Sequence, residues 1–217
     1  MSSLTKKYLL TTLAIFIVFS AGVIVGCSKD QFKTSQAQPS HKVDTMPDNL
    51  KGVHTVPAVG SIDVAFSPEG GITNMLIGEL NAAKKTIHVQ AYSFTSNEII
   101  KALIDAKKRG VDVKIIIDKS NADENNDSSN SKKEKARLDS IVDSGIPLKI
   151  DRGFQIAHSK IMIIDGVDVI TGSFNFSAAA EHSNAENCLI IHDNTKLADT
   201  YEANWQWRWN STDAYTK

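Results

Sequence analysis

A histidine and a lysine two residues apart, His158 and Lys160, stand at the head of the apolar run 161–164. An uninterrupted aliphatic run of this length is typical of a buried β-strand. Side chains alternate across a strand, so the imidazole of His158 and the ammonium group of Lys160 should project from the same face. A nucleophile and a cation would then lie side by side.

A second pair of polar residues follows at the same spacing. After a turn at Asp165, a short strand over residues 169–171 leads to Ser173 and Asn175, again two residues apart. The two strands would gather an imidazole, an ammonium group, a hydroxyl and a carboxamide. This set suits attack by a nucleophilic histidine on a phosphoryl group whose oxygens need cationic and hydrogen-bonding partners.

The pattern H-x-K-x4-D-x6-G-S-x-N is complete from His158 to Asn175 and resembles the signature of the phospholipase D superfamily. The resemblance covers roughly residues 62–209. Most members of that superfamily carry two such motifs in one chain. This sequence carries one, as do the small bacterial non-specific endonucleases and the mitochondrial cardiolipin-hydrolase-like members. The resemblance implies a mixed β-sheet flanked by helices, a layered α/β sandwich with one motif per chain.

The resemblance also implies a role for each motif residue. His158 would be the nucleophile that forms a phosphohistidine intermediate, and Glu186 would hold the other ring nitrogen. Lys160 would clamp the phosphate, because a lysine beside four apolar residues needs an anionic partner. Ser173 and Asn175 would donate hydrogen bonds to the same oxygens.

Two motif residues are interpreted as structural. Asp165 precedes Gly166 at the end of a strand, where an Asp-Gly pair is ordinary turn chemistry. Gly172 is the small residue that precedes the serine. No metal-ligand spacing links the histidines, and the resemblance implies chemistry without a metal or cofactor.

The remaining pattern alternates strands and helices, which favours an α/β layered fold. The polar stretch 119–135 is interpreted as a mobile loop that runs into a helix ending near Gly145. In the terminal helix, Trp205 and Trp209 are four residues apart and should pack on one face. Strands are predicted at 62–66, 86–92, 111–117, 147–150, 161–164, 169–171 and 186–192, and helices around 72–80, 99–109 and the C-terminus.

The N-terminus predicts export. Residues 1–26 combine an early lysine pair with an apolar run, and the sequence Ile-Val-Gly-Cys ending at Cys27 resembles a bacterial lipobox. An ordinary signal peptide and an uncleaved anchor are the alternatives. Residues 27–59 are polar and lack a sustained period, so we interpret them as a flexible tether before a catalytic domain at 60–217. The protein would be periplasmic or on the cell surface, as a membrane-anchored lipoprotein. The second cysteine, Cys188, lies in an apolar run and should be buried.

Composition does not identify the substrate. The net charge is -1, and it becomes more negative without Lys6 and Lys7. There is therefore no basic excess of the kind that a stable nucleic-acid binder carries. A non-specific endonuclease is the first hypothesis. The alternatives are a phospholipase D-type hydrolase of phosphatidylcholine or cardiolipin and, from another class, a non-catalytic binding protein.

A single motif also predicts a partner. Displacing an alcohol from a phosphodiester needs a nucleophile on one side and an acid on the other, and one imidazole cannot serve both sides at once. A two-fold homodimer with a shared site would supply the second His158. The predicted partners are thus a second copy of the chain, a nucleic acid or phospholipid substrate, and a membrane through the lipid anchor.

Overall fold

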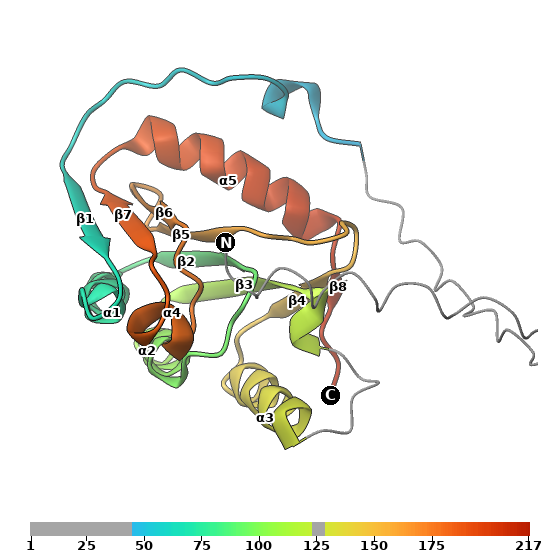
Figure 1. Ribbon diagram of the computed structural model, residues 1–217. Helices are drawn as coiled ribbons and strands as arrows, with labels where there is room; N and C mark the ends of the chain where they lie inside the picture. Colours follow the sequence, from blue (N-terminus) through green and yellow to red (C-terminus); the bar gives the residue numbers. More distant parts are fainter. Residues whose placement is uncertain (1–44, 123–128) are drawn as a thin grey trace, which may run out of the picture. The chain divides into compact units, whose positions relative to one another are not determined.

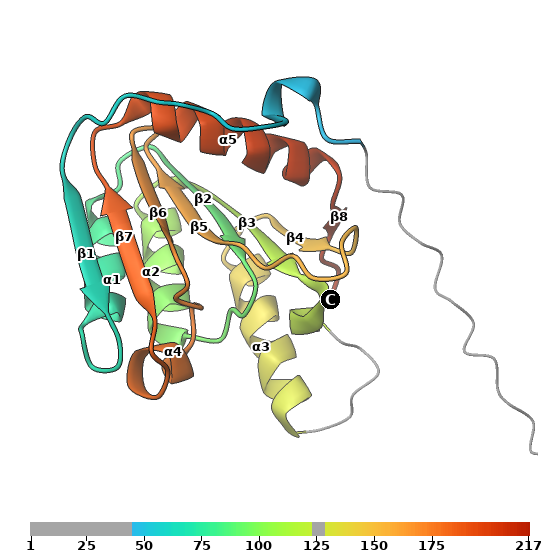
Figure 2. The same cartoon turned by 45° about the horizontal axis from the view of Figure 1, so that its top comes forward.

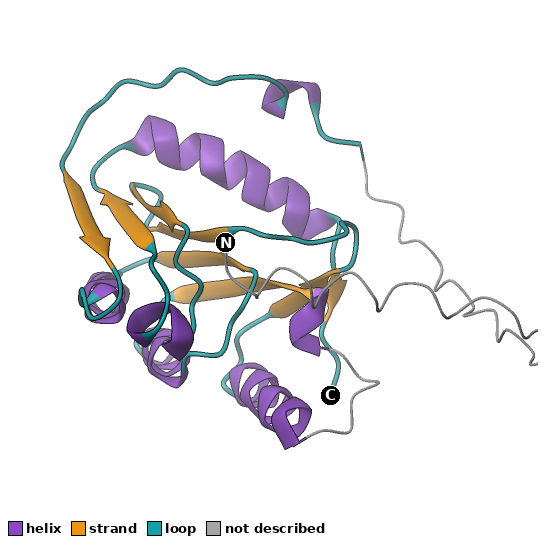
Figure 3. Cartoon of the chain, viewed as in Figure 1, coloured by secondary structure: helices purple, strands orange, loops and turns teal. Residues whose placement is uncertain are grey.

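The computed structural model describes residues 45–122 and 129–217, so the predicted signal peptide and Cys27 lie outside the described residues. In the described part, eight strands form one sheet in the order β1-β7-β6-β5-β2-β3-β4-β8. Figure 1 and Figure 3 show the sheet with helices on both faces. The strands are β1 (Ile62–Phe66), β2 (Thr86–Ala91), β3 (Asp112–Asp118), β4 (Leu148–Asp151), β5 (Lys160–Ile164), β6 (Asp168–Gly172), β7 (Asn187–Ile191) and β8 (Asp213–Ala214).

The sheet is mixed, as the sequence predicts. β2, β3 and β4 run parallel, whereas β5, β6, β7 and β1 are joined by antiparallel pairs. The α/β layered sandwich expected from the resemblance is therefore confirmed. The helices are α1 (Ile72–Ala82), α2 (Asn97–Lys108), α3 (Ser129–Asp143), α4 (Ala178–His182) and α5 (Thr195–Asn210), with 3-10 turns η1 (Asp48–Leu50) and η2 (Lys119–Ala122).

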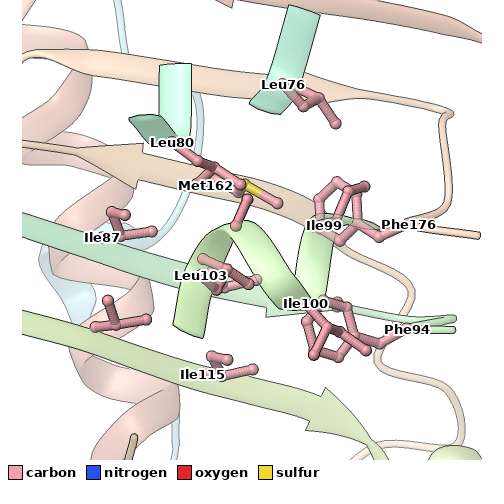
Figure 4. Packing of buried hydrophobic residues seen from close by; sticks show 14 of the residues in the cluster. Leu76, Leu80, Ile87, Phe94, Ile99, Ile100, Leu103, Ile115, Met162 and Phe176 are labelled. Carbon is pink, nitrogen blue, oxygen red and sulfur yellow. The ribbon is translucent and has the colours of Figure 1, made fainter. Parts of the chain in front are cut away.

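The main core lies between the sheet and the helices α1, α2 and α3. Leu76 and Leu80 of α1 and Leu103 of α2 recur at helical spacing and pack on Ile87 and Val89, alternate residues of β2. Figure 4 shows the helix residues Leu80 and Leu103 beside the strand residue Ile87 in this layer. Apolar residues that recur every 3.6 positions in the helices thus pack on apolar residues that alternate in the strand, as expected for amphipathic helices on a sheet.

The opposite face is covered by α5. Trp205 is buried there; its ring stacks on His88 at 4.1 Å and on Trp209 at 4.9 Å. The Nδ1 of His88 lies 2.9 Å from both carboxylate oxygens of Glu202. The helical spacing of the tryptophans therefore gives packing, as predicted, and His88 pairs with α5.

The cover on this face is incomplete. α5 contacts β2, β5 and β6, and Figure 2 shows β1 lying away from it. Along β1, Ala65 packs against the main core, so its neighbours point to the α5 side. Ile62, Val64 and Phe66 are 60%, 55% and 64% exposed. We call these three side chains the β1 strip.

Some segments differ from the sequence interpretation. The polar stretch 119–135 is less of a loop than predicted, because η2 and the start of α3 lie within it. Residues 45–59 of the predicted tether contain η1, and the carbonyl of Pro57 accepts a hydrogen bond from Asn194. The described residues include no helix long and apolar enough to cross a membrane. Cys188 is buried as predicted, and burial raises the pKa of its thiol to about 12.

Candidate active site

His158 and Lys160 meet at the head of β5. The Lys160 Nζ lies 3.0 Å from Nδ1 and 3.1 Å from Nε2 of His158, and it donates to the His158 carbonyl at 2.8 Å. An ammonium group only donates hydrogen bonds, so the ring nitrogen that accepts must carry a lone pair. The same lone pair is what a nucleophilic imidazole needs.

Lys160 carries a buried charge without a close counter-ion. Its residue is only 6% exposed, and within the described ranges no carboxylate lies within ion-pair distance of its Nζ. Burial lowers the pKa of Lys160, an effect that the more distant charge of Glu186 opposes. A desolvated cation in this state gains most from an arriving anion, which is the property of a phosphate clamp.

Tyr92 is a member of the site that sequence reasoning did not assign. The centroid of its ring lies 4.5 Å from the centroid of the His158 ring and 4.9 Å from the Lys160 Nζ. β2 pairs with β5 so that Ala91 faces Lys160, which brings the next residue, Tyr92, beside the histidine. Only the pairing of two strands distant in sequence could have revealed this contact.

Ser173 is oriented by the neighbouring strand. Its Oγ accepts hydrogen bonds from the backbone N–H of Asn187 at 3.0 Å and from the Asn187 Nδ2 at 3.2 Å. A hydroxyl has two acceptor lone pairs and one proton, so both lone pairs are occupied and the proton remains for donation. This arrangement fits the predicted role of a donor to a phosphoryl oxygen.

Gly172 permits the close approach of β6 and β7 beside Ser173. A Cβ atom at this position would lie 2.3 Å from the Asn187 carbonyl oxygen and 3.0 Å from the Cys188 Cα. Both obstacles are backbone atoms and cannot move without displacing β7. Any larger residue would therefore push apart the two strands that orient the serine.

Asn175 leaves a polar atom unpaired. Its Oδ1 is buried, and no group in the part of the chain that the structure describes donates to it. An unsatisfied buried acceptor costs about 1–3 kcal/mol. An unpaired acceptor fits a hydrogen-bond donor of a ligand, whereas the amide Nδ2 of Asn175 is the atom that would donate to a phosphoryl oxygen.

Glu186 lies near the site but does not hold His158. Its Oε1 accepts a hydrogen bond from the Asn184 Nδ2 at 3.0 Å, and its backbone N–H donates to the Ser67 Oγ at 3.1 Å. No described contact joins the Glu186 carboxylate to the imidazole. The structure thus places Glu186 where its charge reaches Lys160, and the predicted bond to His158 is absent from the described residues of the single chain.

Asp165 anchors the turn between β5 and β6 to the start of β2. Its Oδ1 accepts from the backbone N–H groups of Lys85 at 2.7 Å and Thr86 at 2.9 Å, and its Oδ2 accepts from Lys84 at 2.8 Å. Burial raises the pKa of Asp165, but these three backbone bonds outweigh that effect and hold the pKa below its usual range. The geometry supports a structural role.

Asp165→Asn should destabilise the fold. In asparagine an NH₂ group replaces the carboxylate oxygen that accepts from the Lys84 N–H, so two donors would meet and that hydrogen bond would be lost. We therefore expect a loss of about 1.5–3 kcal/mol in the free energy of unfolding. Because the pKa of Asp165 is depressed in the folded state, its contribution is present above about pH 4 and is lost as the pH falls. Urea unfolding at several pH values should show the two proteins converging in acid. Asp199→Asn, on the exposed surface of α5, is the control.

One further group of side chains offers ligand atoms for a cation. Glu79, Asp168 and His192 bring their ligand atoms within 4.8 Å of one another. His192 already pairs with carboxylates, its Nε2 lying 3.2 Å from Asp63 and its Nδ1 3.8 Å from Asp168. Sequence spacing did not predict this cluster, which forms only when α1, β1, β6 and the end of β7 come together.

Comparisons with known proteins find similar sequences. The profile of the family described as "Cardiolipin synthase, PLD-like domain" matches residues 76–209. A protein of Rickettsia bellii named "Phospholipase D" is 36% identical over 193 residues, which are 88% of this chain and 91% of that protein.

Solved structures show the same fold. The crystal structure of Nuc, a phospholipase D family member from Salmonella typhimurium, is 44% identical with a TM-score of 0.65, and the match covers 72% of this chain and 99% of that chain. NucT from Helicobacter pylori, 23% identical with a TM-score of 0.58, matches 71% of this chain and all of its own and shares the fold.

Proposed function

Because the chain belongs to the phospholipase D-like family and is a phosphodiesterase hydrolase, we propose that it cleaves its substrate through a covalent phosphohistidine intermediate on His158. The observation that carries the proposal is the position of the buried Lys160 ammonium, 3.0 Å from the imidazole. A nucleophile and a desolvated cation then meet the same phosphoryl group.

In the first step, a lone pair of His158 attacks phosphorus, the N–P bond forms, and the bond to the leaving oxygen breaks. Lys160, the Ser173 hydroxyl and Asn175 stabilise the charge that develops on the phosphoryl oxygens. In the second step, water gives a proton to the group that protonated the leaving oxygen and attacks phosphorus, the N–P bond breaks, and the imidazole is regenerated. Lys160 supplies the positive charge, so the reaction proceeds without a metal ion.

The leaving oxygen must take up a proton, and we propose that a second copy of the chain supplies it. His158 is exposed at the surface of the single chain, with Ile156 at 53% exposure two residues before it. The β1 strip is also exposed, and Phe66 pairs with Asn187, the residue that holds Ser173. A two-fold partner would cover these apolar side chains and bring its own His158 to the opposite side of the phosphorus.

We propose a polynucleotide as the first substrate, which makes the protein a non-specific endonuclease. The support is the motif resemblance to small bacterial endonucleases and the 44% identity to Nuc across nearly all of that chain. A phospholipid is the second candidate. It is favoured by the relatives named "Phospholipase D", which match this chain over most of its length.

A parallel assay separates the two substrates. Protein lacking residues 1–27 is incubated in EDTA with plasmid DNA in one arm and with phosphatidylcholine–cardiolipin vesicles in the other, with His158→Asn protein as the control. We expect nicking of DNA and no release of headgroup. Headgroup release without nicking of DNA would show that the substrate is a phospholipid. Activity that appears only after addition of a divalent metal would contradict the proposed chemistry.

We also propose that the protein is exported and anchored through a lipid on Cys27. Cys27→Ser should abolish incorporation of labelled palmitate and leave an unprocessed or soluble protein. Cys188→Ser is the matched control, because Cys188 is buried and its substitution should leave the label in place. Unchanged membrane attachment of the Cys27→Ser protein would indicate a transmembrane anchor instead.

A further inference from the structure

The segment 152–159, between β4 and β5, carries the nucleophile but belongs to no helix or strand. Phe154, Ile156 and His158 within it are exposed. The first bond to the sheet comes after the histidine, where the Ser159 carbonyl accepts from the Tyr92 N–H at 2.8 Å. Sheet pairing therefore does not fix the imidazole, and other contacts must determine where it stands.

The start of this segment is held by a buried ion pair. Asp151 is 1% exposed and Arg208, near the end of α5, is 2% exposed. The Arg208 Nε donates to the Asp151 Oδ2 at 3.1 Å, and the Arg208 Nη2 donates to the same oxygen. Figure 2 shows the segment running beside the C-terminal end of α5.

The middle of the segment rests on the same guanidinium. The Cζ of Arg208 lies 4.0 Å from the centroid of the Phe154 ring, and the Trp207 ring meets Phe154 edge-on at 6.2 Å. The Phe154 carbonyl accepts from the Lys119 Nζ at 2.8 Å. A planar guanidinium can bind a carboxylate with its edge while an aromatic ring stacks on its face, which an ammonium group cannot reproduce.

The end of the segment is held from β3. The Asp118 Oδ2 accepts from the backbone N–H of Ala157 at 2.7 Å, one residue before the nucleophile. Asp118 is only 2% exposed, and its Oδ1 accepts from the Ser120 N–H. Charged side chains of other elements therefore hold the chain at Asp151, just before the segment, and at Phe154 and Ala157 within it.

Stability alone does not account for the Arg208–Asp151 pair. A buried ion pair commonly adds little to folding compared with apolar residues of the same volume. The pair also leaves Arg208 Nη1 buried without a hydrogen-bond partner among the described residues. What the guanidinium does provide is a rigid bridge between α5 and two points of the segment that presents His158.

We infer that Arg208 is a positioning residue for the reaction, which acts through Asp151 and Phe154 to place the His158 imidazole in line with the phosphorus. The inference rests on the proposed role of His158. Lys160, Ser173 and Asn175 hold the phosphoryl oxygens and do not contact Arg208. Loss of the guanidinium should therefore lower kcat and leave KM unchanged, because substrate binding persists while the nucleophile is misplaced.

The test is a comparison of kcat, KM and melting temperature in the full-length protein. Arg208→Lys keeps the charge opposite Asp151 but loses the planar stack, and we expect kcat to fall on the order of 10²-fold. Phe154→Leu removes the ring alone and leaves the ion pair, so it should lower kcat in the same direction with an unchanged melting temperature. The second variant decides the question if Arg208→Lys does not fold.

Two controls make the outcome unambiguous. Ile141→Val removes one buried methyl group from α3, on the other side of the sheet, and reports the effect of a small loss of stability. Light scattering checks that the oligomeric mass is the same in every variant. The inference is overturned if Arg208→Lys and Phe154→Leu retain wild-type kcat, or if their losses equal that of Ile141→Val. A wild-type protein that cleaves neither DNA nor phospholipid would instead overturn the proposed function.

Discussion

Asparagine in place of His158 will remove essentially all turnover. The loss should be on the order of 10⁴–10⁶ in kcat, the range observed when a nucleophile or its base is removed from other hydrolases. Asparagine keeps a polar side chain of similar reach but has no nitrogen lone pair that can attack phosphorus. The fold should persist, because His158 is exposed and, within the described residues, its ring contacts Lys160 and Tyr92 alone.

Rapid quenching of the wild-type protein with labelled substrate should trap an acid-labile phosphohistidine, and the His158→Asn protein should trap none. Asn175→Ala serves as the graded comparison. It removes one donor to the phosphoryl oxygens and should cost on the order of 10²–10³ in kcat while the intermediate still forms. Wild-type kinetics in the His158→Asn protein would rule out the covalent mechanism.

Co-expression of wild-type chain with His158→Asn chain will lower activity as the square of the wild-type fraction. In the proposed dimer, a mixed pair would hold one imidazole in the shared site, so only dimers of two wild-type chains would be active. With one chain in ten wild type, activity should be about one-hundredth of the all-wild-type value, against about one-tenth for independent chains. The measurement is specific activity at constant total protein.

Asp199→Asn chain, mixed in the same proportions, is the control and should change nothing, because Asp199 lies on the exposed surface of α5. A linear decline, together with a monomeric mass by light scattering, would show that each chain acts alone. The proton donor would then have to come from the same chain. His88 is not available for that task, because its ring lies between β2 and α5 and pairs with Glu202.

Local sequence patterns predicted most of this molecule. The pair His158 and Lys160 could be recognised because the two residues are two positions apart where an apolar strand begins, although only Lys160 lies in β5 and direct contacts bring the two side chains together. Burial of Trp205 followed from helical spacing in the same way. Each inference depended on neighbours in sequence, and the structure gives the same neighbours in space.

Contacts between distant segments could not be predicted. Asp151 and Arg208 are 57 residues apart, and Glu181, which accepts from the Thr73 N–H and Oγ1 at the start of α1, is 108 residues from its partner. A buried carboxylate leaves no periodic signal, because its partner is fixed by the packing of whole elements. The expected bond from Glu186 to His158 stays a prediction, since in the described part of the single chain the contact given for the Glu186 carboxylate is the one from Asn184 to Oε1.

The pairing of β1 with β7 has a consequence for how the protein matures. Ile62 pairs with Ile191, and in the described part of the chain β1 has no other strand partner. During synthesis, β1 therefore remains unpaired until β7 has been made, and Arg208 is added later still. Such high contact order delays closure of the sheet until the whole chain is available. A chain truncated before β7 would leave β1 without its strand partner, and we expect it to lack the closed sheet that orients Ser173.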